Sequence, residues 1–369
     1  MKVPLVDLAA QQWEINAEVR VGLDAVFAKT AFVGGPDVAA FEREYAAETG
    51  VRYCVGVANG TDAVELALRV AGVTPGGEVI MPANTFIATA EAVSRIGATP
   101  VLVDVDPDHL LIDAANVAKA ITARTQAIVP VHLFGQVAPV ETLLDIASPH
   151  GIPIVEDAAQ SQGALRHDKP AGGLGLVAGT SFYPGKNLGA AGDAGAVTTN
   201  DEEVASKVRI MASHGSPSRY VHDVIGMNSR LDTVQAVVLR AKLTRLAGWN
   251  ERRRKAVDRY SELLSSARGV TLPTSAPGNI DAWHLYVIQL DDRDEVLRRL
   301  QDAGVGAGIH YPTPVHLTRA YAHLGLARGG FPVAEAAADR ILSLPLYPHI
   351  TTEQQEYVAS TLIAAIGPG

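Results

Sequence analysis

Short apolar segments alternate with stretches of helical periodicity between residues 53 and 155. The apolar segments have the length and continuity of buried strands and cover 53–58, 78–81, 99–105, 126–133 and 152–155. The stretches between them repeat apolar residues at helical spacing over 63–71, 85–96, 114–121 and 140–150. Strands and helices that alternate in this way form βα units. The pattern therefore predicts an α/β domain with a mostly parallel sheet.

The two ends of the chain have different patterns. Two helices are predicted before the first strand, at 11–29 and 36–49, with a turn at Gly34-Gly35-Pro36 between them. A helix at 202–212 and a long helical region from about 228 to 267, broken near Gly248, follow the βα units. Beyond it, mixed elements are predicted at 283–290, 294–303, 305–309 and 333–342. We therefore expect a large domain at 1–247 and a smaller α+β C-terminal domain at 248–369.

Composition excludes several kinds of partner. The 369 residues are 47% apolar and 19% charged, which allows a large core. The net charge is −9, and the densest basic run, Arg252–Lys255, has acidic neighbours in a helical pattern typical of a solvated face. Nucleic acid and membrane are therefore not expected partners. No run of 18 apolar residues occurs, and Asp7 interrupts the apolar start of the chain, so we expect a cytoplasmic protein.

Several kinds of site lack support. Cys54 is the only cysteine, so neither a disulfide within the chain nor a cysteine metal site is expected. His310, His316 and His323 have no carboxylate or cysteine partners at ligand spacing, and we expect no metal. The glycines near residue 175 do not have the spacing of a dinucleotide fingerprint. The motifs of α/β-hydrolases and P-loop proteins are also absent.

The turn Asn59-Gly60-Thr61-Asp62 separates a predicted strand from a predicted helix. Ligands of parallel sheets collect at this edge, and a helix N-terminus offers free amides and a positive dipole to a phosphate. Asp62 and Glu65 also resemble a capping pair for the helix. A well-capped helix explains these residues without a ligand, and the two interpretations are compatible.

Lys186 and Asp157 are the chemically informative charges. Lys186 lies in an apolar, glycine-rich stretch from 171 to 199, where its only charged companion is Asp193. A desolvated lysine becomes a neutral amine that forms Schiff bases with carbonyl compounds. Asp157 ends an apolar strand, where a carboxylate either caps the next turn or pairs with a protonated ring nitrogen. Taken singly, the more common roles are a solvated loop lysine and a capping aspartate.

The three features together describe one kind of site. The phosphate-ready turn at Gly60, the carboxylate of Asp157 and the amine of Lys186 match the phosphate, ring nitrogen and aldehyde of pyridoxal 5'-phosphate. We therefore expect this cofactor. Asp193 has no assigned role, and a structural hydrogen bond that fixes its loop is our expectation for it.

The chain resembles the DegT-like sugar aminotransferase family over nearly its whole length. That family has the fold of the aspartate aminotransferase superfamily, or fold type I, which implies a large domain with a mostly parallel sheet and a smaller α+β C-terminal domain. The motifs that carry the resemblance occur in the family's order. They are Val33-Gly-Gly-Pro36, Asn59-Gly-Thr-Asp62, Pro82-Ala-Asn-Thr-Phe86, Val131-His-Leu-Phe-Gly-Gln136, Val155-Glu-Asp-Ala-Ala-Gln160, Ser181-Phe-Tyr-Pro-Gly-Lys186 and Asn228-Ser-Arg-Leu-Asp232.

The resemblance implies a role for individual residues. Gly60, Thr61 and Ser181 bind the cofactor phosphate, Phe86 stacks on the ring, and Gln160 hydrogen-bonds its phenolic oxygen. The family is dimeric, and Asn228 matches a residue that reaches the phosphate of the neighbouring subunit. A homodimer with shared active sites is therefore expected. Since Lys186 is present where related dehydratases have histidine, the resemblance implies a transaminase.

A narrower resemblance concerns the substrate. The stretches Phe182–Gly189 and Ile309–Pro314 are similar to those of the branch that acts on nucleotide-linked 3-oxo-6-deoxyhexoses. We expect a nucleotide sugar, with dTDP as the nucleotide, and an amino sugar for antibiotic or surface-glycan biosynthesis as the product. The substrate-side candidates are Tyr183, His310 and Tyr311, with Arg219 and Tyr220 from a polar loop.

The expected reaction transfers an amino group from L-glutamate to the oxo sugar. Lys186 carries the cofactor as a Schiff base and, once released, moves the proton as general base and acid. Asp157 keeps the ring nitrogen protonated. Two alternatives stay open: the same chemistry on a 4-oxo nucleotide sugar or an oxo-cyclitol, and a regulatory protein that binds pyridoxal phosphate without turnover.

Overall fold

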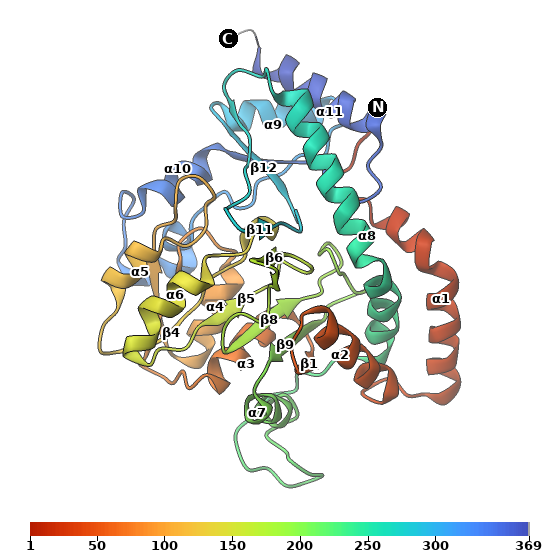
Figure 1. The fold of residues 1–369 in the computed structure, drawn as a ribbon, viewed down its shortest axis with the longest axis vertical. Coiled ribbons are helices and arrows are strands. Elements are labelled where there is room, and N and C mark those ends of the chain that lie inside the picture. The colour runs from red at the N-terminus through yellow and green to blue at the C-terminus, as the bar shows by residue number, and fades with distance from the viewer. Residues whose placement is uncertain (368–369) are drawn as a thin grey trace.

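The computed structural model describes residues 1–367 (Figure 1). Its central sheet has two parts, which contain the strands β1 (Tyr53–Val57), β2 (Glu78–Pro82), β3 (Thr99–Val103), β4 (Thr125–Ile128), β5 (Val155–Asp157), β8 (Val177–Ser181) and β9 (Gly195–Thr199). The order is β3-β2-β4 in one part and β5-β8-β9-β1 in the other. Parallel bridges between Ile128 and Ile154 and between Val131 and Asp157 join β4 to β5.

Most neighbouring strands of this sheet are parallel, as predicted. The pairs β2–β3, β2–β4 and β5–β8 are parallel, whereas β9 runs antiparallel to both β8 and β1. The helices associated with these strands are α3 (Gly60–Val70), α4 (Ile87–Ile96), α5 (Ala114–Ala120), α6 (Val140–Ala147) and α7 (Glu202–Ala212). The polar segments that follow the parallel strands therefore meet at one edge of the sheet.

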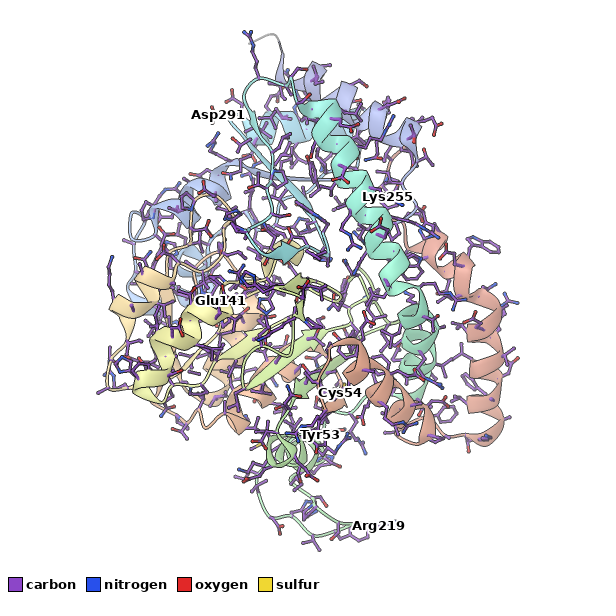
Figure 2. All side chains as sticks on the ribbon, in the orientation of Figure 1. Tyr53, Cys54, Glu141, Arg219, Lys255 and Asp291 are labelled. Carbon is purple, nitrogen blue, oxygen red and sulfur yellow. The ribbon has the colours of Figure 1, made fainter. Side chains whose placement is uncertain are left out.

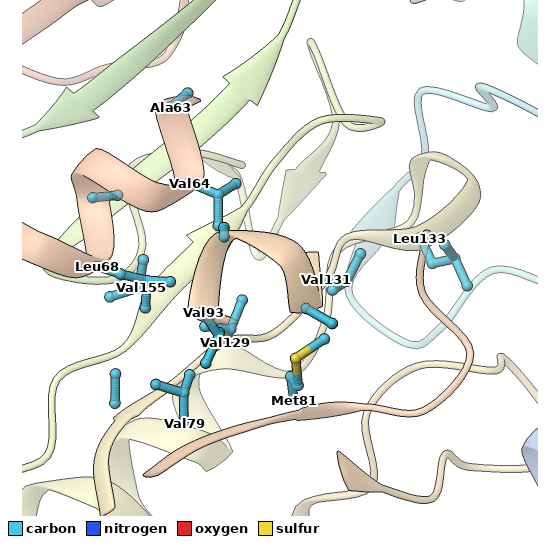
Figure 3. Packing of buried hydrophobic residues seen from close by; sticks show 14 of the residues in the cluster. Ala63, Val64, Leu68, Val79, Met81, Val93, Val129, Val131, Leu133 and Val155 are labelled. Atoms are coloured by element: carbon cyan, nitrogen blue, oxygen red, sulfur yellow. The ribbon is translucent and has the colours of Figure 1, made fainter. Parts of the chain in front are cut away.

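The core between the sheet and helices α3 and α4 consists largely of small and β-branched side chains (Figure 3). Val64 and Leu68 on α3 and Val93 on α4 pack on Val79 of β2 and Val155 of β5, and all five are less than 5% exposed. β-Branched residues favour the pleated surface of a strand, and short side chains let a helix approach it closely. This packing fixes the N-terminus of α3 against the sheet.

The C-terminal part has its own sheet and core. β12 (Tyr286–Leu290) pairs antiparallel with β10 (Val270–Thr271) and β13 (Ile341–Leu344). Tyr260, Tyr286 and Leu342 lie in a core shared by that sheet and nearby helices. These helices are α8 (Thr233–Leu264), α9 (Arg293–Asp302) and α11 (Thr352–Ile366), and α10 (Pro332–Arg340) leads into β13. The division of domains at residue 247 stays a prediction.

The N-terminal helices α1 (Leu8–Lys29) and α2 (Pro36–Glu48) pack on α8. The residues before α1 cross to the C-terminal part, where Val3 pairs with Val305. The remaining short elements are β6 (Leu165–Arg166), β7 (Lys169–Pro170), β11 (Asn279–Ile280) and the 3-10 turns Leu133–Gly135, Ser148–His150, Val315–Leu317 and Arg319–Leu324. No helix within residues 1–367 is long and apolar enough to span a membrane.

Several sequence predictions about elements were wrong. The helix expected to break near Gly248 is continuous, because Gly248 faces open space while Leu246 and Trp249 are buried on the other side. Residues 305–309 make isolated bridges rather than a strand. The segment 126–133 pairs as β4 only to Ile128; beyond it Pro130 has no N–H to donate, and a 3-10 turn begins at Leu133.

Candidate active site

A cavity of about 720 Å³ lies at the edge of the sheet where the parallel strands end. Most of the residues predicted for the site line it: Gly60, Thr61, Phe86, Asp157, Gln160, Ser181, Tyr183, Lys186, His310 and Tyr311. The cavity lining also includes residues from the N-terminal segment, Leu5 and Val6, and from the C-terminal part, His284 and Leu285. A cavity of this size with convergent polar groups is typical of a small-molecule site.

The floor of the cavity is the N-terminus of α3. A Cβ atom on Gly60 would lie 2.5 Å from the Cβ of Ser181, and one on Gly195 would lie 2.4 Å from the Asn59 oxygen. Glycine at these positions lets the helix start rest directly on β8 and β9. The side-chain oxygen of Asn59 accepts a hydrogen bond from the Asp62 amide at 2.8 Å. The amides of Gly60 and Thr61 have no hydrogen-bond partner within the helix.

This floor has the chemistry of a phosphate site. Free amides, the helix dipole and the hydroxyls of Thr61 and Ser181 converge at one place, and each favours an anion. The predicted capping pair was wrong, because the cap is Asn59. Asp62 and Glu65 instead bind Arg95 of α4 at 3.0 and 2.9 Å, which ties the two helices together.

Two successive carboxylates at the end of β5 have different surroundings. Glu156 is fully buried and accepts hydrogen bonds from the amides of Gly172, Leu174 and Gly175 and from His132 Nε2, each at 2.8 Å. Burial alone would raise the pKa of Glu156, yet these donors hold it below its usual value. With its hydrogen-bonding capacity occupied, Glu156 has a structural role.

Asp157 points to the opposite face and lines the cavity. Its Oδ2 accepts a hydrogen bond from Thr89 Oγ1 at 2.7 Å, and its Oδ1 accepts one from the Ala159 amide at 3.1 Å. Each carboxylate oxygen can accept two hydrogen bonds, so each keeps a lone pair for a ligand. The carboxylate is therefore held in place and still able to bind a cationic ring N–H.

Lys186 lines the same cavity as Asp157 and lies on a folded loop. The Phe182 amide donates to the Ala194 oxygen, the Ala190 amide to the Phe182 oxygen, and the Lys186 amide to the Tyr183 oxygen, at 2.7–2.8 Å. Burial lowers the pKa of the Lys186 amine to about 8, and the Asp157 carboxylate opposes that shift. The neutral amine required of a nucleophile is therefore accessible near neutral pH.

Gln160 has a fixed amide orientation. Its Oε1 accepts a hydrogen bond from the Phe134 amide at 2.7 Å, so its Nε2 must be the end that donates to the Tyr311 hydroxyl at 3.1 Å. One N–H of Nε2 then stays free at the cavity. The ring of Phe86 lies 5.1 Å from that of Tyr311, tilted by 38°. A donor and an aromatic face thus accompany the carboxylate and the amine.

Two histidines in the cavity are held neutral. Burial lowers the pKa of His284 well below its usual value, and the charges of Lys186 and Arg253 add to this shift. Its Nδ1 contacts Asn187 Oδ1 at 3.1 Å. Burial and the charge of Lys186 likewise lower the pKa of His310, whose Nδ1 lies 2.8 Å from Ser343 Oγ. Neither ring adds a positive charge that would compete for the cofactor phosphate.

Three predicted residues lie outside the cavity of their own chain, within the part that the structure describes. Arg219 lies on the loop that projects after α7 (Figure 2). Its guanidinium donates a hydrogen bond to the hydroxyl of the neighbouring Tyr220 at 3.1 Å. Asn228 accepts a hydrogen bond from Arg230 at 3.1 Å. A single chain therefore does not bring these residues to Lys186.

Asp193 differs from our expectation. It lines the cavity with an exposed side chain and makes no side-chain hydrogen bond within residues 1–367, so the expected structural bond was wrong.

Sequence reasoning missed other residues of the site. Thr89 follows Thr85 by four positions, and this helical spacing could have placed both hydroxyls on one face. His284 and Val6 come from parts of the chain that strand-end reasoning does not reach. No signal in the sequence marks them as neighbours of Lys186.

Comparison with known proteins agrees with this geometry. Residues 14–363 match the model of the DegT/DnrJ/EryC1/StrS aminotransferase family. The chain belongs to this family. It is a pyridoxal phosphate-dependent aminotransferase with the type I fold, and the donors around Gly60, Asp157 and Lys186 suit the phosphate, ring nitrogen and aldehyde of that cofactor.

Individual relatives of this aminotransferase match over almost their whole length. The erythromycin biosynthesis sensory transduction protein EryC1 of Saccharopolyspora erythraea is 47% identical over 99% of this chain and 100% of its own. The dTDP-3-amino-3,4,6-trideoxy-alpha-D-glucose transaminase of Streptomyces venezuelae is 44% identical over 96% and 93%. The crystal structure of S. venezuelae DesV in complex with a ketimine intermediate has a TM-score of 0.97 at 42% identity, covering 100% and 99%.

Proposed function

We propose that this aminotransferase moves the amino group of L-glutamate to carbon 3 of a nucleotide-linked 3-oxo-6-deoxyhexose, with dTDP as the nucleotide. The observation that carries the proposal is the 44% identity to a transaminase named for a dTDP-linked 3-amino sugar. The product is a 3-amino sugar for antibiotic or surface-glycan biosynthesis.

The cofactor residues have complementary proposed roles. Gly60, Thr61 and Ser181 hold the phosphate, Asp157 the protonated ring nitrogen, and Lys186 the aldehyde carbon; Phe86 and Gln160 complete the ring site. When bound, pyridoxal phosphate supplies the electron sink that weakens the bonds at the α-carbon of the amino donor.

Lys186 is also the proposed general base and acid. Its amine, with a pKa near 8 before the cofactor binds, is suited to take a proton from the α-carbon of glutamate and return it on the way to product. The carboxylate of Asp157 is the proposed partner of the ring nitrogen. Tyr183, His310 and Tyr311 line the cavity and are the proposed sugar-binding residues, because their hydroxyl and imidazole groups are suited to hydrogen-bond the oxygens of a sugar.

The second copy of the chain completes the proposed site. Asn228, Arg219 and Tyr220 do not reach the cavity of their own chain, although Arg219 is a suitable partner for a diphosphate. We propose that the protein is a homodimer in which these residues act on the neighbouring subunit's phosphate and nucleotide. The large exposed fraction of Tyr220, 81%, leaves its ring available for such a contact.

A panel of oxo substrates tests the proposal. The cofactor-loaded enzyme receives glutamate with dTDP- and UDP-linked 3-oxo sugars, 4-oxo sugars and an oxo-cyclitol, and NMR fixes the aminated carbon. We expect turnover with dTDP-linked 3-oxo-6-deoxyhexose and nitrogen on carbon 3. Preferred amination of carbon 4, or of a cyclitol, overturns the substrate assignment.

A regulatory role is the second candidate, because EryC1 is named a sensory transduction protein. Incubation with glutamate alone separates the two. An aminotransferase converts its cofactor and releases one equivalent of 2-oxoglutarate per active site, whereas a protein that only binds the cofactor releases none. The complete set of Lys186, Asp157 and Gln160 supports turnover.

A further inference from the structure

Two buried hydroxyls form a chain that ends on Asp157. Thr85 lies in the loop after β2 and is 3% exposed, and Thr89 lies in the first turn of α4 and is 1% exposed. Their Oγ1 atoms are 2.8 Å apart, and Thr89 Oγ1 is 2.7 Å from Asp157 Oδ2. Both threonines line the cavity.

The direction of this hydrogen-bond chain follows from proton counting. An ionised carboxylate only accepts, so the single hydroxyl hydrogen of Thr89 must point to Asp157. Thr89 therefore has no hydrogen left for Thr85, and Thr85 must donate to Thr89. The chain runs one way, from Thr85 through Thr89 to the carboxylate.

The usual bond of a helical threonine is different. Thr361 in α11, for example, donates to the carbonyl oxygen of Tyr357, four residues before it, at 2.6 Å, and this local bond is common for Ser and Thr in helices. Thr89, in the first turn of α4, donates instead to a side chain 68 positions away in the sequence. Its bond to Asp157 therefore ties the start of α4 to the end of β5.

We propose that Thr89, held by Thr85, is a positioning residue that keeps Asp157 ionised and oriented toward the ring nitrogen of the cofactor. This inference rests on the proposed role of Asp157. A hydroxyl that donates to a carboxylate stabilises its charged form, so a proton shared between Asp157 and the ring stays on the ring. Thr89 and the Ala159 amide, one on each oxygen, also prevent the carboxylate from rotating.

The test compares isosteric and conservative variants. Thr89→Val keeps the shape and removes the donor, Thr89→Ser keeps the donor, and Thr85→Val removes the outer hydroxyl. Thr198→Val is the matched control, because Thr198 is 2% exposed and donates to the Gly172 oxygen at 2.6 Å, outside the cavity lining. Circular dichroism and thermal unfolding verify that each variant folds.

Two readouts follow the proton. The first is the 15N NMR signal of bound pyridoxal phosphate labelled at the ring nitrogen, which reports protonation independently of turnover. The second is kcat and KM for glutamate in the first half-reaction. For Thr89→Val we expect a signal shifted toward unprotonated nitrogen and a kcat lowered about 10- to 100-fold, the value of one hydrogen bond to a charged group. KM should change by less than about twofold, since the donor acts on Asp157 and not on glutamate.

The remaining variants make the result decisive. Thr89→Ser should restore the wild-type signal, Thr85→Val should give a smaller shift than Thr89→Val, and Thr198→Val should give none. A wild-type 15N signal and kcat in a folded Thr89→Val overturn the proposal. If Thr89→Val does not fold, Thr85→Val and Thr89→Ser still test it, because an unshifted signal in Thr85→Val, or a shifted one in Thr89→Ser, contradicts the hydrogen-bond chain.

Asp157→Asn separates this inference from the proposed function. If Asp157→Asn shifts the ring-nitrogen signal and Thr89→Val does not, only the hydrogen-bond chain is wrong. If Asp157→Asn also leaves the signal unchanged, the proposed role of Asp157 is wrong.

Discussion

Lys242 is buried and Lys186 is half-buried at the cavity, and desolvation lowers the pKa of each to about 8. Lys242 is 5% exposed within α8, lies outside the cavity lining, and makes no hydrogen bond or ion pair with the residues that the structure describes. Lys186 lines the cavity together with Asp157, whose charge acts on its amine. Desolvation alone therefore yields a reactive amine at two places, but a cavity and a counter-charge exist at only one of the two.

The largest expected difference between the two lysines is in catalysis. Lys186→Ala should abolish turnover and the visible absorbance of the cofactor bound through its amine, because Lys186 is the one lysine among the described residues that line the cavity. Lys242→Met should keep turnover within about twofold. Steady-state assays and absorbance spectra of both variants check this. Turnover and absorbance that survive in Lys186→Ala would falsify the assignment.

The charge of Asp157 should matter to one lysine only. Asp157→Asn removes the anion beside the ring nitrogen, and we expect kcat to fall about 100- to 1,000-fold, as for loss of a preorganised electrostatic partner. Asp157 also raises the pKa of Lys186, so that pKa should fall further below 8 in the variant, while that of Lys242 stays unchanged. A kcat near the wild-type value would remove Asp157 from the chemistry.

The pH dependence of cofactor capture sharpens the comparison. In the cofactor-free protein, only the neutral amine of Lys186 attacks pyridoxal phosphate. The initial rate should rise about tenfold per pH unit below 8 and level off above it, following the pKa of Lys186. Stopped-flow absorbance between pH 6 and 10.5 measures this. A rate that keeps rising through pH 10 would show a lysine with an ordinary pKa.

The smallest expected effect is on stability, and here the two lysines should behave alike. Each has a pKa of about 8 in the folded state and 10.5 as its ordinary value. The unfolded state thus holds the proton more tightly, and the penalty is complete below pH 8 and disappears as the pH rises toward 10.5. Lys186→Met and Lys242→Met should each raise the unfolding free energy of the cofactor-free protein at pH 7 by about 1–3 kcal/mol.

Urea denaturation at pH 7 and pH 10 measures this effect. The gain should be present at pH 7 and shrink at pH 10 in both variants. A gain for one lysine alone shows that burial affects the two amines differently.

Much of the fold was predictable because its signals are local. The helix at 202–212 was predicted with the bounds observed for α7, Glu202–Ala212, since Asp201 caps it and its apolar spacing is regular. The predicted break near Gly248 was wrong for a tertiary reason. The buried side chains of Leu246 and Trp249, which flank the glycine in sequence, hold α8 continuous through it. The helix predicted at 333–342 took in the first two residues of β13, because Ile341–Leu344 is short and apolar and becomes a strand only by pairing with β12.

The candidate site divides in the same way. Gly60 and Asp157 lie at the ends of predicted strands, where ligands collect, and Lys186 stood out as the one lysine of an apolar, glycine-rich stretch. His284 reaches the cavity only because the C-terminal part of the chain packs on the part that holds the central sheet. Thr89 lines the cavity from the first turn of α4. Asp62 and Glu65 have the spacing of a capping pair, but both carboxylates form ion pairs with Arg95 of α4. Contacts between distant segments carry no signal in a single sequence.

Chemical location of the cofactor tests the central claim most directly. Reduction of the cofactor-loaded protein with borohydride fixes pyridoxal phosphate on the amine that holds it, and peptide mass spectrometry identifies that lysine. We predict one equivalent of label on Lys186 and none on Lys242. Label on Lys242 or another lysine, with Lys186 unmodified, would contradict the account.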